Sequence, residues 1–238
     1  MNAFETPIER PLEYALELSL APPFSLIFED SALLVFNKPS GLLSVPGKGP
    51  EKADCLRTRV QQVYPEALTV HRLDMSTSGI LLMARSAELH RHLSITFANR
   101  EVEKRYIAVV DGQVAGNPPD SPADAWQLID KPIATDWVNR PLQKIDNIEG
   151  KASQTRYRVM SYDETTDTTR LELAPVTGRT HQLRVHLQSI GHSILGDHLY
   201  ASPEVQAKST RLMLHASELH LAHPVTGKSL AFQCACPF

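Results

Sequence analysis

The apolar residues of this chain occur in short runs, and several runs are neighbours in the sequence with only a turn between them. Those at 24–28 and 33–36 are separated by little more than Glu29, Asp30 and Ser31. Such a short connection joins antiparallel strands, because parallel neighbours need a crossover of about a dozen residues or more. Similar β-rich runs predict further strands at 78–84, 106–110, 153–162, 169–174, 211–222 and 229–234. We therefore predict an α+β fold with a mixed, mainly antiparallel sheet and flanking helices.

Four polar residues mark predicted helix starts. Asp54, Ser86, Thr180 and Ser202 each precede a stretch with helical periodicity or a proline at the first helical position. The helix after Thr180 is expected to end at Gly191, where a left-handed conformation is common. The helices therefore lie between the strands without forming a regular strand–helix–strand series.

The chain divides into an acidic lead, residues 1–23, and one domain, residues 24–238. The segment 111–124 is rich in proline, glycine and aspartate and is predicted to be a loop. The sequence contains no run of 18 apolar residues, so we predict no membrane-spanning helix. The N-terminus does not resemble a secretory signal. Its three cysteines are expected to be reduced thiols, which favours a cytoplasmic protein.

The net charge of −3 first argues against a nucleic-acid partner. However, the first 30 residues hold six acidic side chains and one basic side chain, so their −5 leaves +2 on the other 208 residues. Basic groups occur at 91–105, 131–151 and 179–186. The charge distribution therefore favours an anionic substrate.

The densest group of reactive side chains is His71, Arg72 and Asp74, which precede the turn Ser76-Thr-Ser-Gly79. A carboxylate before a buried strand is a common catalytic arrangement. It is equally common for an aspartate to brace a turn. The residues alone leave both interpretations open.

Four segments in order resemble the RluA-type pseudouridine synthases. They are NKPSGLLSV (37–45), HRLD with TSG (71–74, 77–79), KRYIA (104–108), and GRTHQLRVH followed by GHSILGD (178–186, 191–197). The resemblance covers about residues 25–235 and implies the catalytic fold of that family. DWVNRP (136–141) and the LSVP turn (43–46) further resemble the subgroup that modifies both tRNA and 23S rRNA. Many members of that family carry a small RNA-binding module before the catalytic domain, but the roughly 24 residues before the first predicted strand are too few for one, so we expect none here.

By this resemblance the chain is an enzyme that isomerises specific uridines in structured RNA, such as the tRNA anticodon stem-loop or 23S rRNA, to pseudouridine. It implies Asp74 as the catalytic carboxylate, Arg184 as the cation that stabilises its charge, and Tyr106 as the residue stacking on the uracil. The isomerisation exchanges no group with a second reactant, so we expect no cofactor and no metal.

The resemblance and the basic groups also suggest contacts with RNA. Arg72 lies next to the nucleophile and suits a phosphate or the position vacated by a flipped base. The candidate RNA-binding residues are Arg72, Lys104, Arg105, Arg140, Lys144 and Arg179. Trp137 and Asn139 are further candidates for contacts with loop bases.

Other function classes fit less well. The ten histidines lack an HExxH pattern, and the Cys234/Cys236 pair has no second pair to complete a zinc site. A catalytically silent RNA-binding or chaperone protein on the same fold is the main alternative, and a hydrolase using Asp74 as nucleophile is another. The first is disfavoured because Asp74, Tyr106 and Arg184 are all present. We expect a monomer.

Overall fold

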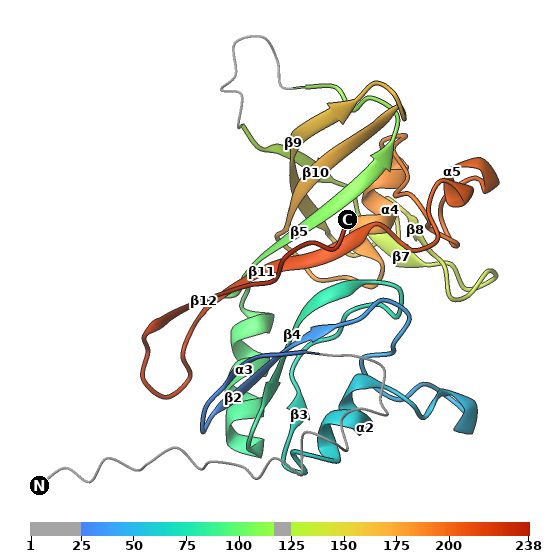
Figure 1. Ribbon diagram of the computed structural model, residues 1–238. Helices are drawn as coiled ribbons and strands as arrows, with labels where there is room; N and C mark the ends of the chain where they lie inside the picture. Colours follow the sequence, from blue (N-terminus) through green and yellow to red (C-terminus); the bar gives the residue numbers. More distant parts are fainter. Residues whose placement is uncertain (1–24, 117–124) are drawn as a thin grey trace, which may run out of the picture.

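A long, strongly twisted sheet runs through the computed structural model, which describes residues 25–116 and 125–238 (Figure 1). Its strand order is β1-β2-β4-β11-β5-β10-β9-β6, with β3 paired to β4 and β12 paired to β11. The strands are β1 Ser25–Glu29, β2 Leu33–Lys38, β3 Leu68–Thr69, β4 Ser78–Ala84, β5 Glu103–Asp111, β6 Gln127–Asp130, β9 Gln154–Asp163, β10 Thr168–Pro175, β11 Leu214–Ala222 and β12 Ser229–Gln233. The helices are α2 Leu56–Gln61, α3 Ala87–Ala98, α4 Gln182–Ser189 and α5 Pro203–Ala207, with a short 3₁₀ turn at Pro50–Lys52.

Strand β11 joins two halves of the sheet. On one side it pairs with β4 in parallel, and on the other it pairs with β5 in antiparallel register. Among the described strands the other pairings are antiparallel, which confirms the predicted α+β class with a mixed, mainly antiparallel sheet. Gly79 stands at this junction with a φ of 112°, and a Cβ there would lie 2.2 Å from the backbone oxygen of Ala216. Only glycine allows the two backbones to meet so closely.

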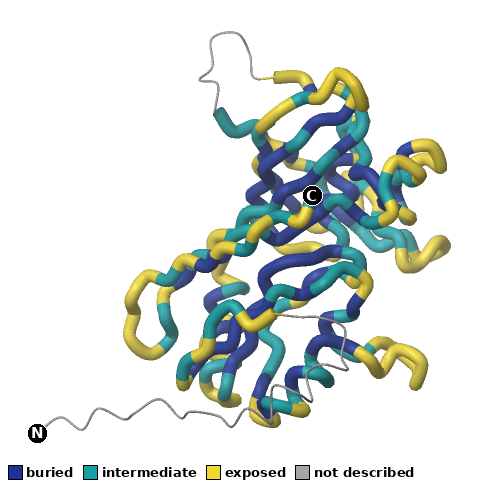
Figure 2. Tube along the Cα trace, viewed as in Figure 1, coloured by how far each residue is buried: buried dark blue, intermediate teal, exposed yellow. Residues whose placement is uncertain are grey.

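The N-terminal half of the sheet is covered on both faces. Alternate residues of β4 point to opposite sides: Leu82 packs in a cluster with Leu93 of α3, and Leu81 packs in a cluster with Leu56 of α2. Every residue of β4 is therefore buried, as the continuous apolar run at 78–84 predicted (Figure 2).

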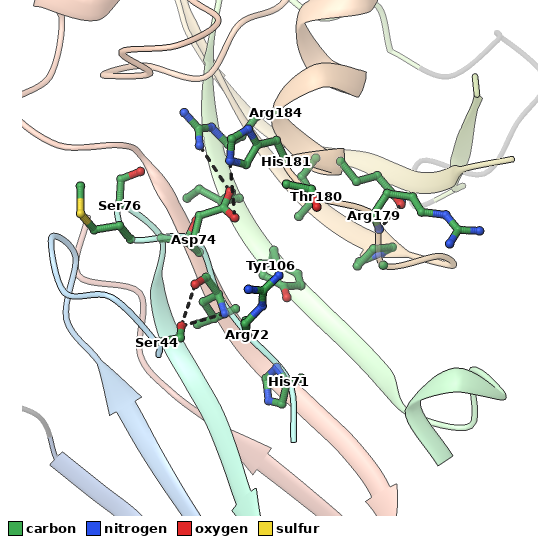
Figure 3. Close-up of a pocket in the computed structure, with 18 of the residues that line it drawn as sticks. Ser44, His71, Arg72, Asp74, Ser76, Tyr106, Arg179, Thr180, His181 and Arg184 are labelled. Carbon is green, nitrogen blue, oxygen red and sulfur yellow. Dashed lines mark hydrogen bonds and ion pairs between the residues drawn. The ribbon is translucent and has the colours of Figure 1, made fainter. Parts of the chain in front are cut away.

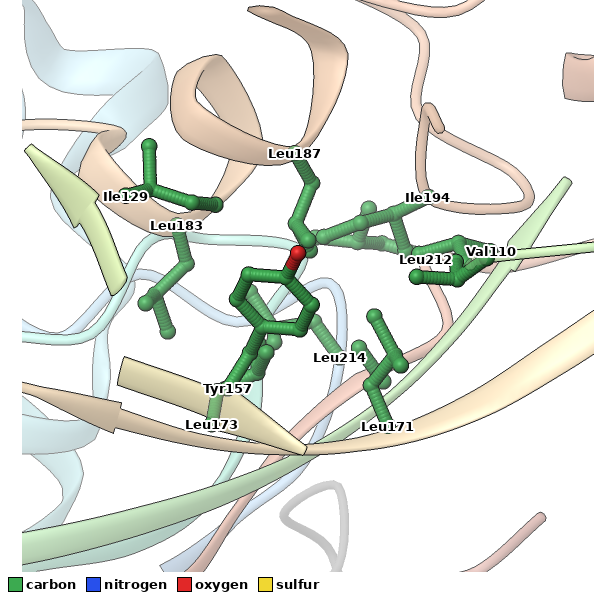
Figure 4. Packing of buried hydrophobic residues seen from close by; sticks show 12 residues of the cluster. Val110, Ile129, Tyr157, Leu171, Leu173, Leu183, Leu187, Ile194, Leu212 and Leu214 are labelled. Carbon is green, nitrogen blue, oxygen red and sulfur yellow. The ribbon is translucent and has the colours of Figure 1, made fainter. Parts of the chain in front are cut away.

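The C-terminal half is covered on one face by α4. Tyr157 of β9, Leu173 of β10 and Leu187 of α4 belong to one buried cluster (Figure 4). The opposite face of these strands carries charged side chains, among them Arg156 and Arg158 of β9. This one-sided burial explains the alternation that predicted a strand at 153–162.

A second, two-stranded sheet was not predicted. The strands β7 Ile133–Thr135 and β8 Gln143–Ile145 form a hairpin outside the main sheet, with the loop 136–142 at its tip. Three-residue strands between prolines leave almost no periodic signal, which is why the sequence pattern missed them.

Two predicted helix starts are wrong by one residue each. Helix α2 is capped by Cys55, whose sulfur accepts from the Thr58 N–H, while Asp54 instead forms an ion pair with Arg59. Helix α4 begins after His181, not after Thr180. The caps at Ser86 and Ser202 and the left-handed Gly191 are confirmed. The acidic lead 1–23 and residues 117–124 of the predicted loop lie outside the described residues.

Candidate active site

Asp74 lies in the loop that leads into β4, and the segment 37–45 holds this loop in place. The Ser44 hydroxyl donates to the Leu73 carbonyl at 2.7 Å and accepts from the Leu73 N–H at 3.0 Å. The Gly41 N–H donates to the Met75 carbonyl at 2.8 Å. These bonds fix the backbone on both sides of Asp74, so the carboxylate is positioned by residues about 30 positions earlier in the chain.

The buried Lys38, at the end of β2, forms a second set of hydrogen bonds that hold the loop. Its ammonium group donates to the carbonyls of Pro39, Leu42 and Met75 at 2.8, 2.8 and 3.1 Å. Three acceptors match the three N–H donors of a charged lysine. Burial lowers the pKa of Lys38 to about 7, and the negative charge of Asp74 opposes that shift. The lysine therefore ties the turn after β2 to the loop that carries Asp74.

Arg184 reaches Asp74 from α4, on the far side of the cavity (Figure 3). Its Nη1 lies 3.3 Å from Oδ2 of Asp74, and its Nε and Nη2 bind the buried Asp197 at 2.8 and 2.6 Å. Burial opposes the charge of Arg184, but the two carboxylates outweigh it and raise its pKa. A bidentate partner leaves the guanidinium little freedom to move. Arg184 is thus a fixed positive charge beside the Asp74 carboxylate.

Tyr106 approaches the same space from β5 (Figure 3). Burial raises the pKa of its hydroxyl, and the negative charge of Asp74 raises it further. Its hydroxyl has no hydrogen-bond partner within 25–116 and 125–238. The phenol therefore stays protonated at neutral pH and keeps its donor and acceptor sites for a bound molecule.

The three side chains line one open cavity of about 950 Å³. Its lining holds five lysine and arginine side chains, Arg72, Arg100, Lys104, Arg179 and Arg184. Asp74 is the one acidic residue among the described residues that line it. A chain with a net charge of −3 thus forms a pocket that attracts an anion.

Two predicted RNA-binding residues lie at the mouth of this cavity with exposed side chains. Arg72 is exposed, and within the described part of the chain its guanidinium has no hydrogen-bond or ion-pair partner. Arg179 is exposed and makes only a long contact to the Ala152 carbonyl. Lys104 also lines the cavity, two residues before Tyr106 on the same face of β5, and burial lowers its pKa. All three therefore place basic side chains along the lining of the cavity.

The other three predicted RNA-binding residues lie elsewhere. Arg105 points to the opposite face of β5, where it stacks over Trp126 at 4.9 Å and lies 3.7 Å from Glu172. Arg140 lies at the tip of the β7–β8 hairpin and stacks on Trp137. Lys144 of β8 pairs with Asp146 at 3.1 Å and does not line the cavity.

His71, which follows β3, is structural. Its Nε2 accepts a hydrogen bond from the Leu82 N–H at 3.0 Å, and its ring stacks on Phe97 at 4.8 Å. Burial lowers its pKa to about 3, so the ring is neutral. Its neighbours Arg72 and Asp74 extend toward the cavity.

Sequence reasoning missed several residues that shape this site. Asp197 holds Arg184, and Tyr200 bonds to His181, which lies 4.0 Å from Asp74. The carboxylate at the end of the GHSILGD segment was the available signal for Asp197, since a buried arginine needs a buried acid. From the sequence, His181 is only one member of the basic group at 179–186. The described residues contain no group of three or more side chains placed to hold a metal ion.

Comparisons with known proteins show the family of this chain. A family model described as RNA pseudouridylate synthase matches residues 32–189. This chain belongs to that family. It is similar to the dual-specificity RNA pseudouridine synthase RluA of Yersinia pestis, at 46% identity over 90% of this chain and 99% of the relative. The protein of that name from Haemophilus influenzae is 41% identical over 92% and 96% of the two chains.

A solved structure shows the same fold. The human RNA pseudouridylate synthase domain containing 1 superposes with a TM-score of 0.73 at 26% identity, covering 91% of this chain and 84% of the human one. The predicted family and fold are therefore confirmed. No helix within residues 25–116 and 125–238 is long and apolar enough to cross a membrane.

Proposed function

We propose that this protein converts uridine in RNA to pseudouridine, with Asp74 as the catalytic carboxylate. The observation that carries the proposal is the convergence of three side chains from distant segments. Asp74 from the loop before β4, Tyr106 from β5 and Arg184 from α4 surround one cationic cavity. Family membership gives this arrangement its chemistry.

The reaction is an isomerisation within one nucleotide. The bond between N1 of uracil and C1′ of ribose breaks, and its electron pair leaves with the uracil. The base turns, C5 forms a new bond to C1′, C5 loses its proton, and N1 gains one. Apart from the proton lost at C5 and the proton gained at N1, every atom of the uridine therefore remains in the product.

Each of the three side chains has a role that fits its position. The Asp74 carboxylate acts on the ribose, either at C1′ or on a sugar proton, and both routes need an ionised oxygen facing the sugar. Arg184 stabilises that charge from the Oδ2 side. Tyr106 presents its ring to the uracil, and its unpartnered hydroxyl is placed to assist when the C5 proton leaves.

The target nucleotide has to leave its base stack to enter a pocket of this kind. The exposed guanidinium of Arg72, two residues before Asp74, is suited to the vacated position or to a flanking phosphate. Lys104 and Arg179 supply further positive charge to the lining of the cavity. We include these three in the proposed RNA contacts and leave out Arg105 and Lys144, which are paired outside the cavity.

The β7–β8 hairpin is a second RNA-contacting surface in this proposal. Pro141 of its tip lines the cavity, while Trp137 is 69% exposed and stacks with the Arg140 guanidinium at 3.8 Å. Exposed aromatic and guanidinium planes stack on unpaired bases. Because the similar RluA proteins are named as having dual specificity, we propose tRNA and 23S rRNA stem-loops as the substrates.

These substrates also suggest where and how the protein works. RNA of both kinds is abundant in the cytoplasm, so we place the activity there. A single copy supplies Asp74, Arg184 and Tyr106 to its own cavity, which supports action as a monomer.

The experiment is release of tritium from RNA labelled at C5 of uridine. The purified protein should release tritium from unmodified tRNA or 23S rRNA transcripts, one equivalent for each pseudouridine found after digestion. Binding of RNA without tritium release would support a silent RNA-binding protein on this fold and reject the proposal. Mapping pseudouridines in RNA from cells with and without the protein then identifies the target sites.

A further inference from the structure

A chain of three polar groups connects the β7–β8 hairpin with the catalytic carboxylate. The Gln143 N–H of β8 donates to the Tyr200 hydroxyl oxygen at 2.9 Å, and the Tyr200 hydroxyl lies 2.7 Å from Nδ1 of His181. Nε2 of His181 then faces Oδ1 of Asp74 at 4.0 Å. The roles proposed above for Asp74, Arg184 and Tyr106 do not involve Tyr200 or His181.

The Tyr200–His181 hydrogen bond fits either tautomer of His181, and we assign it the direction in which the Tyr200 proton has a partner. Burial raises the pKa of Tyr200 to about 12, so it keeps its one O–H proton at neutral pH. Because its oxygen already accepts from Gln143, that proton is available for Nδ1 of His181. The Nδ1 atom is then an acceptor and carries no proton.

His181 is neutral for a reason of its own. Burial lowers its pKa; Asp74 and Asp197 oppose this shift, and the positive charge of Arg184 reinforces it. A neutral imidazole has one N–H, and with Nδ1 accepting, that N–H is on Nε2. His181 therefore points a hydrogen-bond donor at the reacting carboxylate.

The two oxygens of Asp74 now differ. Oδ2 is bound by Arg184 at 3.3 Å, whereas Oδ1 faces the N–H of His181 across 4.0 Å. This gap is too long for a direct hydrogen bond. Both the N–H and Oδ1 are therefore available to a third group that enters the cavity.

The backbone also favours this arrangement. His181 has φ 53° and ψ 18°, a left-handed conformation that costs energy for any residue with a Cβ. It stands at the N-cap of α4, yet its side chain makes no capping hydrogen bond there. The strained backbone instead turns the imidazole toward Tyr200 and Asp74, and strain of this kind gathers at functional sites.

We propose that His181 is a further catalytic residue, which donates its Nε2–H to the uridine held at Oδ1 of Asp74, and that Tyr200 is a positioning residue that sets its tautomer. The inference rests on the proposed function for the identity of the substrate. The proton stays on His181 throughout, so no covalent step is added. The donor binds an oxygen of the departing uracil, where negative charge develops as the glycosidic bond breaks.

The first test compares two amides at position 181. Asparagine tolerates the left-handed backbone and places its amide near the site of Nδ1, but it has no group at the site of Nε2. Glutamine places an N–H donor farther out, near the site of Nε2. We expect His181→Asn to lower kcat by about 100-fold with KM for RNA within about threefold, and His181→Gln to recover at least about tenfold of that loss.

Two outcomes of this comparison would overturn the proposal. One is an asparagine variant as active as the parent, and the other is equal loss in both variants while thermal melting shows both to be folded. If either variant fails to fold, the decision passes to the spectroscopic test, which uses the unaltered protein.

The second test reads the tautomer directly. Long-range ¹H–¹⁵N spectra of protein labelled at histidine should show His181 with a protonated Nε2 and an unprotonated Nδ1 at neutral pH. The signals are assigned in the unaltered protein by correlating each imidazole ring with its assigned backbone, and Tyr200→Phe should change the Nδ1 resonance. A proton on Nδ1 at neutral pH would overturn the inference.

This spectrum does not depend on turnover. A parent protein that makes no pseudouridine defeats the proposed function whatever the tautomer of His181. An active parent with an active His181→Asn variant defeats the role of His181 alone. The two failures are therefore distinguishable.

Discussion

The two faces of strand β5 differ in what their basic side chains contact. On one face Lys104 and Tyr106 border a cavity with five cationic side chains and one described carboxylate, Asp74. On the other face Arg105 stacks over Trp126 and lies near the buried Glu172, which accepts from Arg158 at 2.5 Å. On the first face the basic side chains line a cavity that a ligand can enter. On the second face they contact residues of the protein itself. The side of the strand therefore predicts binding better than the number of basic residues does.

The largest effect that tests this contrast is loss of the cavity carboxylate. Asp74→Asn should lower tritium release by about a thousandfold or more, because the amide cannot act as nucleophile or base. RNA affinity should stay within about tenfold in a filter-binding assay, since the amide has nearly the same shape. A variant that kept most of its activity would remove Asp74 from the reaction.

Glu172→Gln on the opposite face is the matched control. It replaces a buried carboxylate that holds Arg158, so the melting temperature should fall. Its turnover, measured well below that temperature, should remain close to the parent value. Comparable losses of turnover in both variants would erase the functional difference between the two faces.

The next effect concerns two tyrosines. Tyr106→Phe keeps the aromatic ring and removes the unpartnered hydroxyl, so kcat should fall by about 100-fold. Tyr157→Phe removes a hydroxyl that donates to Gln127 at 2.6 Å outside the cavity. It should cost about 1 kcal/mol of folding free energy and leave kcat unchanged. Equal kcat values for the two variants would contradict the role given to Tyr106.

A smaller effect is expected for two arginines. Arg72→Ala should weaken RNA binding by about tenfold, because it removes an unpaired cation from the cavity mouth. Arg105→Ala should change the affinity by less than about twofold, since Arg105 is occupied by Trp126 and Glu172. Titrations of labelled stem-loop RNA measure both. A larger loss for Arg105 would place RNA on the opposite face.

The smallest effect is on salt dependence. With a few placed cations, the slope of log affinity against log salt should have a magnitude of about 3. Arg72→Ala should reduce it by about 1, whereas Arg105→Ala should leave it unchanged. A slope matching ten or more phosphate contacts in the parent would mean that RNA covers far more than this cavity.

The fold could be predicted from local patterns where burial is simple. The continuous apolar run of β4 and the alternation in β9 each report which faces are covered. The β7–β8 hairpin was not predicted, because its strands are too short to show the alternation of apolar and polar residues. The helix start at His181 was not predicted, because the surrounding structure imposes its left-handed conformation, which is uncommon for any residue other than glycine.

The site could be predicted only through family resemblance. Asp74 and Arg184 are 110 residues apart, and no spacing rule brings them together. Arg105 was grouped with Lys104 as a candidate RNA contact, although strand alternation places neighbours on opposite faces. Asp197 was overlooked because its role depends on a bidentate geometry that sequence does not display.

The position of β11 has a consequence for how the enzyme comes into being during synthesis. The strand between the two halves of the sheet is made of residues 214–222, near the end of the chain, whereas Asp74 and Tyr106 are synthesised far earlier. Until β11 is inserted between β4 and β5, no pairing links the half that carries Asp74 to the half that carries Tyr106. On a ribosome, a chain synthesised as far as residue 200 would contain every catalytic side chain named above but would lack β11. We therefore expect the catalytic centre, and with it the activity, to form in one late step.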